Sequence, residues 1–242
     1  MRALRRTFGA IALAALLLCG GFLLFAMLRG RPQDMPWTPL DLGEPVGTFT
    51  GRKLAGLTHD FARCQALLRR AGVQFDVLPE VEDGHCGYGD GVRLAIGGSR
   101  RIGFLPDVPA VSCPMGAALA VWEWQVVQPA ARKHLGRQVY AFEHYGSYAC
   151  RHIAGAGETG WSEHSTADAL DIAGFRLDDA TRITIKRDWN GGGEKAAFLR
   201  EVRDGACRLF ATVLSPDYNA AHQDHLHLDQ AERGEWGWRS CR

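Results

Sequence analysis

Two patterns of apolar and polar positions alternate along residues 57–242, one with a helical period and one with period two. Helices are expected at 57–72, 113–136 and 194–215, and strands at 73–79, 92–98, 137–145, 169–175, 182–189 and 225–229. Gly72 and Gly136 are expected to end the first two helices, and Pro129 to kink or divide the second. Helices interspersed with short strands predict an α+β fold with a small, mainly antiparallel sheet flanked by helices.

The first 28 residues have a different pattern. The basic stretch MRALRR precedes a charge-free apolar run over residues 7–28. A run of about 20 apolar residues can span a bilayer, and a signal-peptide core has only roughly 7–15. The sequence therefore predicts a transmembrane signal anchor at 1–28, with a cleaved signal peptide as the alternative. The N-terminal arginines favour a cytoplasmic N-terminus, so the body is expected at the periplasmic face of the inner membrane, or free in the periplasm after cleavage.

Prolines without periodicity mark residues 29–56, which we expect to be an extended linker. The folded domain is then 57–242. Its composition is that of a globular protein, with 46% hydrophobic residues. Lys and Arg number 28 against 27 Asp and Glu, for a net charge of +1, and no basic stripe interleaves with aromatic residues. These features do not favour a nucleic-acid partner.

Six cysteines are scattered through the domain without a CxxC pair: Cys64, Cys86, Cys113, Cys150, Cys207 and Cys241. An even number in an exported protein predicts three disulfide bonds, and the sequence leaves their pairing open. Cysteine ligation of zinc is not indicated.

Two stretches place polar side chains in apolar strands. In ALDIAGF, period-two alternation puts Asp171 on one face between Ala169 and Ala173. A buried carboxylate needs a partner, for which a metal ion and an arginine are both suitable. In HLHLD, the same alternation puts His225, His227 and Asp229 on one face. Two imidazoles directed the same way can meet one ion, and zinc accepts histidine nitrogen and carboxylate oxygen.

The motif SEHSTADALD, followed downstream by HLH, resembles the LAS group of zinc peptidases. This group includes D-Ala-D-Ala carboxypeptidases, peptidoglycan endopeptidases and the Hedgehog signalling domain. With VVQPAARKHLG, GSYACR, VRDGACRLF and SPDYNAAHQDHLHLD, the chain more closely resembles bacterial extensin-like C-terminal domain proteins over residues 58–241. The resemblance implies a LAS/Hedgehog-like metallopeptidase core with Zn²⁺ held by His164, Asp171 and His227, leaving one position for water.

The same resemblance implies roles for further residues. Asp224, three residues before His227, matches the acid-x-x-His arrangement of some relatives and is one candidate general base, while His225 is the other candidate, as proton shuttle or oxyanion stabiliser. Arg151 corresponds to an arginine that holds substrate carboxylate or polarises the scissile carbonyl in relatives; from the residues alone, a structural salt bridge is an equal alternative. Ser162 would orient the site, and Ala167 stands where the family pattern has glycine.

These expectations define a zinc-dependent hydrolase of peptidoglycan peptide bonds. A D,D-type endopeptidase is favoured over a carboxypeptidase, with peptide stems of the wall as partner and the N-terminal anchor as the contact with the membrane. A non-catalytic zinc-containing module that binds the cell wall is the alternative, and a purely structural disulfide-stapled domain is a third. The oligomeric state stays open.

Overall fold

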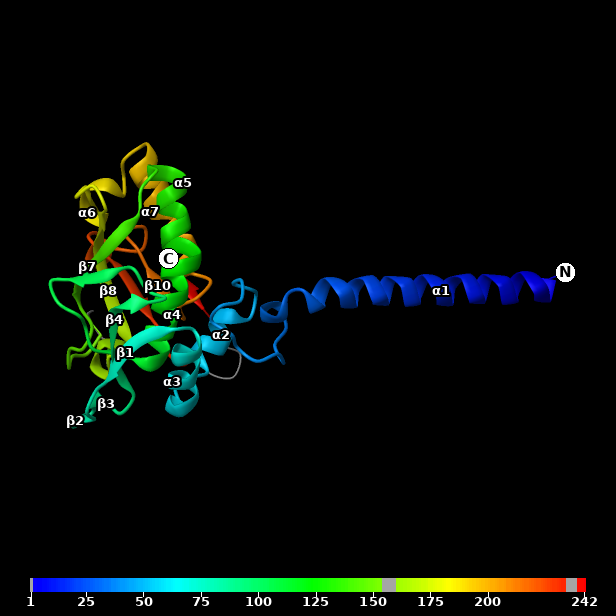
Figure 1. Cartoon of the computed structure of the whole chain (residues 1–242), viewed down its shortest axis with the longest axis horizontal. Coiled ribbons are helices and arrows are strands. Elements are labelled where there is room, and N and C mark those ends of the chain that lie inside the picture. The colour runs from blue at the N-terminus through cyan, green and yellow to red at the C-terminus, as the bar shows by residue number, and fades with distance from the viewer. Residues whose placement is uncertain (1, 154–159, 234–238) are drawn as a thin grey trace.

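The computed structural model describes residues 2–153, 160–233 and 239–242 (Figure 1). The chain folds as α+β around a mixed sheet of seven strands. Across the sheet these are β12 (Ser240–Cys241), β10 (Thr212–Leu214), β11 (Leu226–Asp229), β8 (Ala169–Leu177), β7 (Val139–Gly146) and β5 (Gly103–Leu105), with β9 (Arg182–Thr184) paired to β8. The β5–β7 and β10–β12 pairs are parallel, and the others are antiparallel.

Two smaller sheets lie beside the main one. The first has the order β1 (Val73–Val77), β4 (Gly91–Gly98) and β6 (Val111–Ser112), and the second is the hairpin of β2 (Val81–Asp83) and β3 (Cys86–Tyr88). The strands expected near 73–79 and 92–98 are therefore present as β1 and β4. The hairpin lies between these two strands in the sequence.

Helices cover one face of the main sheet (Figure 1). They are α4 (Cys113–Trp122), α5 (Gln128–Leu135) and α7 (Glu194–Ala206). The short α6 (Ile185–Asp188) follows β9 and contacts α7, and α3 (Phe61–Arg70) packs against α4 and β1. Trp122 of α4 is fully buried and stacks on Phe142 of β7 at 5.3 Å between ring centroids. Its indole donates a hydrogen bond to the carbonyl of Val202 in α7 (2.9 Å), which satisfies its one polar atom.

The second expected helix is present as two α-helices that a π-helical turn joins directly. A π-helical turn, η2 (Glu123–Val127), joins α4 to α5, and the N–H of Gln128 bonds to the carbonyl of Glu123. Pro129 has no N–H and cannot bond to the carbonyl four residues before it. The wider π-turn precedes the proline, and the left-handed Gly136 (φ 61°) ends α5 as expected.

Two expected elements end earlier than the sequence pattern indicates. Helix α7 stops at Ala206, and residues 212–214 form strand β10 against β11. Strand β9 stops at Thr184, whose side chain accepts a hydrogen bond from the N–H of Arg187 and begins α6. In both places tertiary pairing or capping outweighs the local periodicity.

Helix α1 (Arg2–Arg29) precedes the domain. Among the described residues, no helix is long and apolar enough to cross a membrane, so the expected transmembrane helix is wrong.

Residues 29–56, for which an extended linker was expected, contain the short helices η1 (Pro32–Asp34) and α2 (Thr50–Ala55). Leu40, Leu42 and Leu54 in this segment are buried in the same hydrophobic core as the domain.

Three disulfide bonds confirm the prediction from the cysteine count: Cys64–Cys113, Cys86–Cys150 and Cys207–Cys241. The first links α3 to the start of α4, and the third links the residue after α7 to β12. The second ties β3 to the loop after β7. This loop leads towards the candidate site.

Candidate metal centre

Strands β8 and β11 place Asp171 and His227 side by side. The two residues are direct partners in the antiparallel register of these strands. Their neighbours Leu170, Ile172, Leu226 and Leu228 are fully buried in the hydrophobic core. Because side chains alternate along a strand, Asp171 and His227 point to the opposite face from this core. The alternation expected for both strands thus positions the two polar groups.

A short 3-10 helix, η3 (Glu163–Thr166), supplies His164. Ser162 caps this helix by accepting a hydrogen bond from the backbone N–H of His164 (3.3 Å). The chain leaves η3 through Ala167, whose φ of 57° lies in the left-handed region that glycine adopts most easily. This conformation explains in physical terms why a glycine suits that position in the family pattern. Here alanine occupies it.

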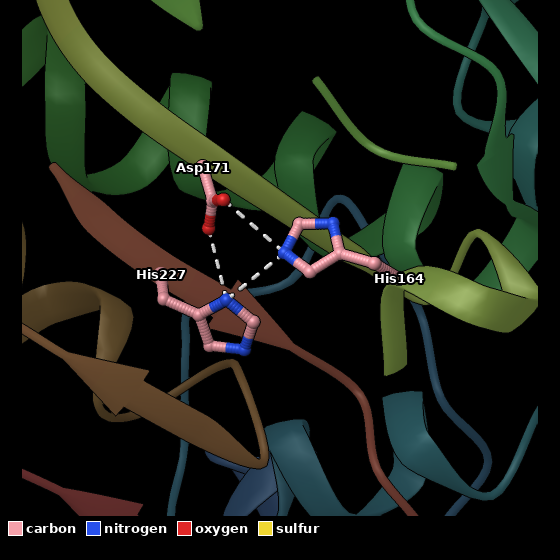
Figure 2. A group of neighbouring side chains, drawn as sticks. All are labelled: His164, Asp171 and His227. Carbon is pink, nitrogen blue, oxygen red and sulfur yellow. Dashed lines mark hydrogen bonds and ion pairs between the residues drawn. The ribbon is translucent and has the colours of Figure 1, made fainter. Parts of the chain in front are cut away.

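The three side chains converge at one point (Figure 2). His227 Nδ1 lies 2.9 Å from Asp171 Oδ1, and His164 Nε2 lies 3.2 Å from Asp171 Oδ2. The two imidazole nitrogens are 3.3 Å apart. One donor atom from each residue therefore lies within 4.8 Å of the others. The cluster is buried, with 3% of the His164 side chain, 11% of Asp171 and 13% of His227 exposed.

In each imidazole, the hydrogen bond of the nitrogen that points away from the cluster determines whether the nitrogen that points into the cluster carries a proton. His164 Nδ1 donates to the carbonyl of Ser147 (2.5 Å), and His227 Nε2 donates to Asp229 Oδ2 (3.1 Å). A neutral imidazole carries one N–H, so each ring then turns a lone pair towards the carboxylate. Two nitrogens and one oxygen facing one another need a positive charge between them. The donor set suits zinc, which binds histidine nitrogen and carboxylate oxygen and keeps an open position in catalytic sites.

The ionisation of the cluster reflects the same need for positive charge. Burial alone would raise the pKa of Asp171, but its interactions with the imidazoles of His164 and His227 outweigh it and hold that pKa well below its ordinary value. Burial would lower the pKa of His227, but hydrogen bonds to Asp171 and Asp229 raise it to about 9. Without a cation, a proton on His227 therefore supplies the charge. A bound metal ion would replace this proton.

The first histidine of the HLH motif faces the cluster from one side. His225 precedes β11, and its Nε2 lies 3.6 Å from Asp171 Oδ1. Its Nδ1 bonds to Asp224 Oδ1 at 2.9 Å. Asp224 therefore lies in the loop before the strand and contacts the far side of the His225 ring. The structure brings both candidate residues to the site and places the imidazole of His225 between Asp224 and the cluster.

Residues 149–152 pair with residues 161–164 as a short two-stranded ribbon, and Arg151 reaches the cluster from the first of these strands. The N–H of Ala149 bonds to the carbonyl of His164, and the N–H of Ser162 bonds to the carbonyl of Arg151. This pairing holds the Arg151 guanidinium 3.9 Å from Asp171 Oδ2, with 49% of its side chain exposed. Arg151 thus combines a long ion pair with access to solvent.

Three further contacts were missed by the sequence reasoning. The carbonyl of Ser147 carries no side-chain signal at all. The ring of Tyr145 packs edge-on against His225, but its position near the end of a strand does not indicate this contact. Asp229 was expected on the same face as His227, and that alternation was the available signal for its contact with the His227 ring.

The fold and the site together define an α+β protein with a buried His–Asp–His cluster suited to a divalent metal ion. Residues 62–242 match the family model described as Extensin-like protein C-terminus, and the chain belongs to this family. Searches among curated proteins and among solved structures find no match to the chain.

Proposed function

We propose that this protein is a zinc-dependent hydrolase of peptide bonds in peptidoglycan, with the D,D-type cross-link as its substrate. The observation that carries the proposal is the convergence of His164, Asp171 and His227, each of which places one possible ligand atom within 4.8 Å of the others. The resemblance of the motifs around these residues to LAS-type zinc peptidases supplies the reaction class. A zinc ion held there would polarise a peptide carbonyl and acidify water for attack on it.

His225 is proposed as the group that moves the proton. Its Nδ1–H donates to Asp224, so its Nε2 is free to accept a proton on the side that faces the cluster. Asp224 then acts through His225, because its carboxylate holds the far side of the ring. Of the two candidate bases, this geometry favours His225 as the base and Asp224 as its positioning residue.

Arg151 is proposed to bind the substrate beside the cluster. Its half-exposed guanidinium presents several N–H donors beside the cluster, and a planar fork of donors suits either a carboxylate or a peptide carbonyl that gains negative charge. The Cys86–Cys150 disulfide lies next to it in sequence and tethers the ribbon that carries it. Structural disulfides also favour an oxidising compartment, which agrees with a substrate in the periplasm.

The test is conversion of cross-linked muropeptide dimers by the full-length protein, followed by mass spectrometry with and without a chelator. We expect chelator-sensitive cleavage that zinc restores, and the fragment masses identify the bond. His225→Gln should keep zinc and lose about 10²- to 10⁴-fold in rate. His152→Gln is the control. His152 lies on the same ribbon as Arg151, and its ring stacks on Trp161, with 4.0 Å between the ring centroids. Intact dimers from folded, zinc-loaded protein would favour the wall-binding module instead.

A further inference from the structure

Asp229 occupies the last position of β11, two residues after His227 and on the same face. It is 3% exposed. Its Oδ2 accepts the hydrogen bond from His227 Nε2 (3.1 Å), and its Oδ1 accepts one from the backbone N–H of Ala231 (3.1 Å). Both oxygens are therefore engaged away from the cluster of His164, Asp171 and His227, so Asp229 contacts the ring of His227 and not the point where a metal ion would lie.

The two histidines of the cluster present different nitrogens to it (Figure 2). His164 comes from η3 and reaches the cluster with Nε2, the nitrogen farther from its backbone. His227 lies directly opposite Asp171 in the β8–β11 register. Directly opposed residues have Cβ atoms only about 4.5–5.5 Å apart, so the nitrogen that meets Asp171 Oδ1 is the nearer one, Nδ1, at 2.9 Å.

A nitrogen binds a metal ion only when it carries no proton. The ring of His227 must therefore keep its single N–H on Nε2, and Nε2 needs a strong acceptor to hold it. The buried carboxylate of Asp229 is that acceptor. Without it, the proton can move to Nδ1, where it would bond to Asp171 and occupy the place of the metal ion.

We infer that Asp229 is a positioning residue for metal binding, which fixes Nδ1 as the ligating nitrogen of His227. This inference rests on the proposed metal centre and adds a requirement to it. Acceptors behind metal-bound histidines typically change metal affinity by about 10- to 100-fold. Asp229→Asn is the sharpest perturbation, because an amide has nearly the same shape but can donate to Nε2 and so favour the proton on Nδ1.

The experiment measures the zinc dissociation constant of the full-length protein by competition with a chelating dye. Asp229→Asn should bind zinc about 10- to 100-fold more weakly than the wild type. Asp217→Asn is the matched control, because Asp217 also accepts a hydrogen bond from a ring N–H, that of Trp189 (2.9 Å), and should leave the constant unchanged. Equal affinity of Asp229→Asn and wild type would overturn the inference while leaving the metal centre intact. A wild-type chain that binds no zinc would overturn the metal centre, and the inference with it.

A second measurement does not depend on the folding of any variant. Nitrogen–proton correlation spectra of the zinc-loaded wild type, with ¹⁵N-labelled histidine, report which ring nitrogen carries the proton. We expect His227 to carry it on Nε2 and His164 on Nδ1. A proton on Nδ1 of His227, with zinc bound, would contradict the assignment of Asp229.

Discussion

The buried ion pair between Arg100 and Glu123 offers the most direct test of how this fold is stabilised. Both side chains are almost fully buried, at 0% and 1% exposure. Arg100 Nε donates to Glu123 Oε2 (3.0 Å), and the other carboxylate oxygen accepts hydrogen bonds from the backbone N–H groups of Arg101 and Ile102. Glu123 also begins the π-turn η2. One carboxylate therefore satisfies a buried charge and two backbone donors.

Replacing Glu123 by alanine should destabilise the protein strongly. The change leaves the Arg100 guanidinium without its buried counter-ion, and breaking such a pair costs about 3–5 kcal/mol. At roughly 2–4 °C per kcal/mol for a domain of this size, the unfolding midpoint should fall by about 6–20 °C. The measurement is thermal unfolding followed by circular dichroism, with urea unfolding to give the free energy.

The paired replacement Arg100→Met with Glu123→Leu separates the charge from the packing. With both charges removed, the double variant should be more stable than Glu123→Ala, because no unpaired ion is left in the core. Lys133→Met serves as the surface comparison, since Lys133 and its partner Glu201 are 63% and 38% exposed. A loss of less than about 1 kcal/mol in Glu123→Ala, the scale of an exposed ion pair, would refute the reasoning.

Three further predictions follow from the site and its surroundings. Zinc at about 100 times its dissociation constant should stabilise the wild type by about 2.7 kcal/mol. Calorimetry should show the corresponding rise of the unfolding temperature in His152→Ala but not in Asp171→Ala. A rise retained in Asp171→Ala would contradict the assignment of Asp171 as a metal ligand. Removing the Cys86–Cys150 bond by a double alanine substitution should cost about 2–5 kcal/mol in urea unfolding, and an unchanged midpoint would show that the tether does not contribute. Burial raises the pKa of Asp168 well above its ordinary value, against the hydrogen bond from Ser112. The folded state therefore binds this proton more tightly than the unfolded state, and stability should fall as pH rises above the ordinary pKa of 3.8. Urea unfolding at several pH values should show a smaller fall of stability in Asp168→Asn than in the wild type. An equal fall in both would exclude Asp168 as the source of the pH dependence.

Local patterns were sufficient to predict much of the framework. Period-two alternation placed Asp171 and His227 on one face of their strands, because side-chain direction in a strand depends only on the spacing along the chain. An even number of cysteines predicted disulfide bonds, and resemblance of short motifs selected His164, Asp171 and His227 as a group. Local patterns were less reliable where elements end. The helical stripe continued past Ala206, and the N-terminal run was taken for a transmembrane helix, which no described helix is long and apolar enough to be.

Only the tertiary structure decided how these groups meet. The register of β8 against β11 selects Nδ1 of His227, and the chain path through η3 selects Nε2 of His164. The order of Asp224, His225 and the cluster depends on a loop conformation, and the cysteine pairing depends on contacts between residues 34 to 64 positions apart. Alternation and composition are properties of neighbouring residues, so the sequence determines them directly. Hydrogen-bond partners across strands and loops depend on the whole packed chain, and for that reason they appear only in the folded protein.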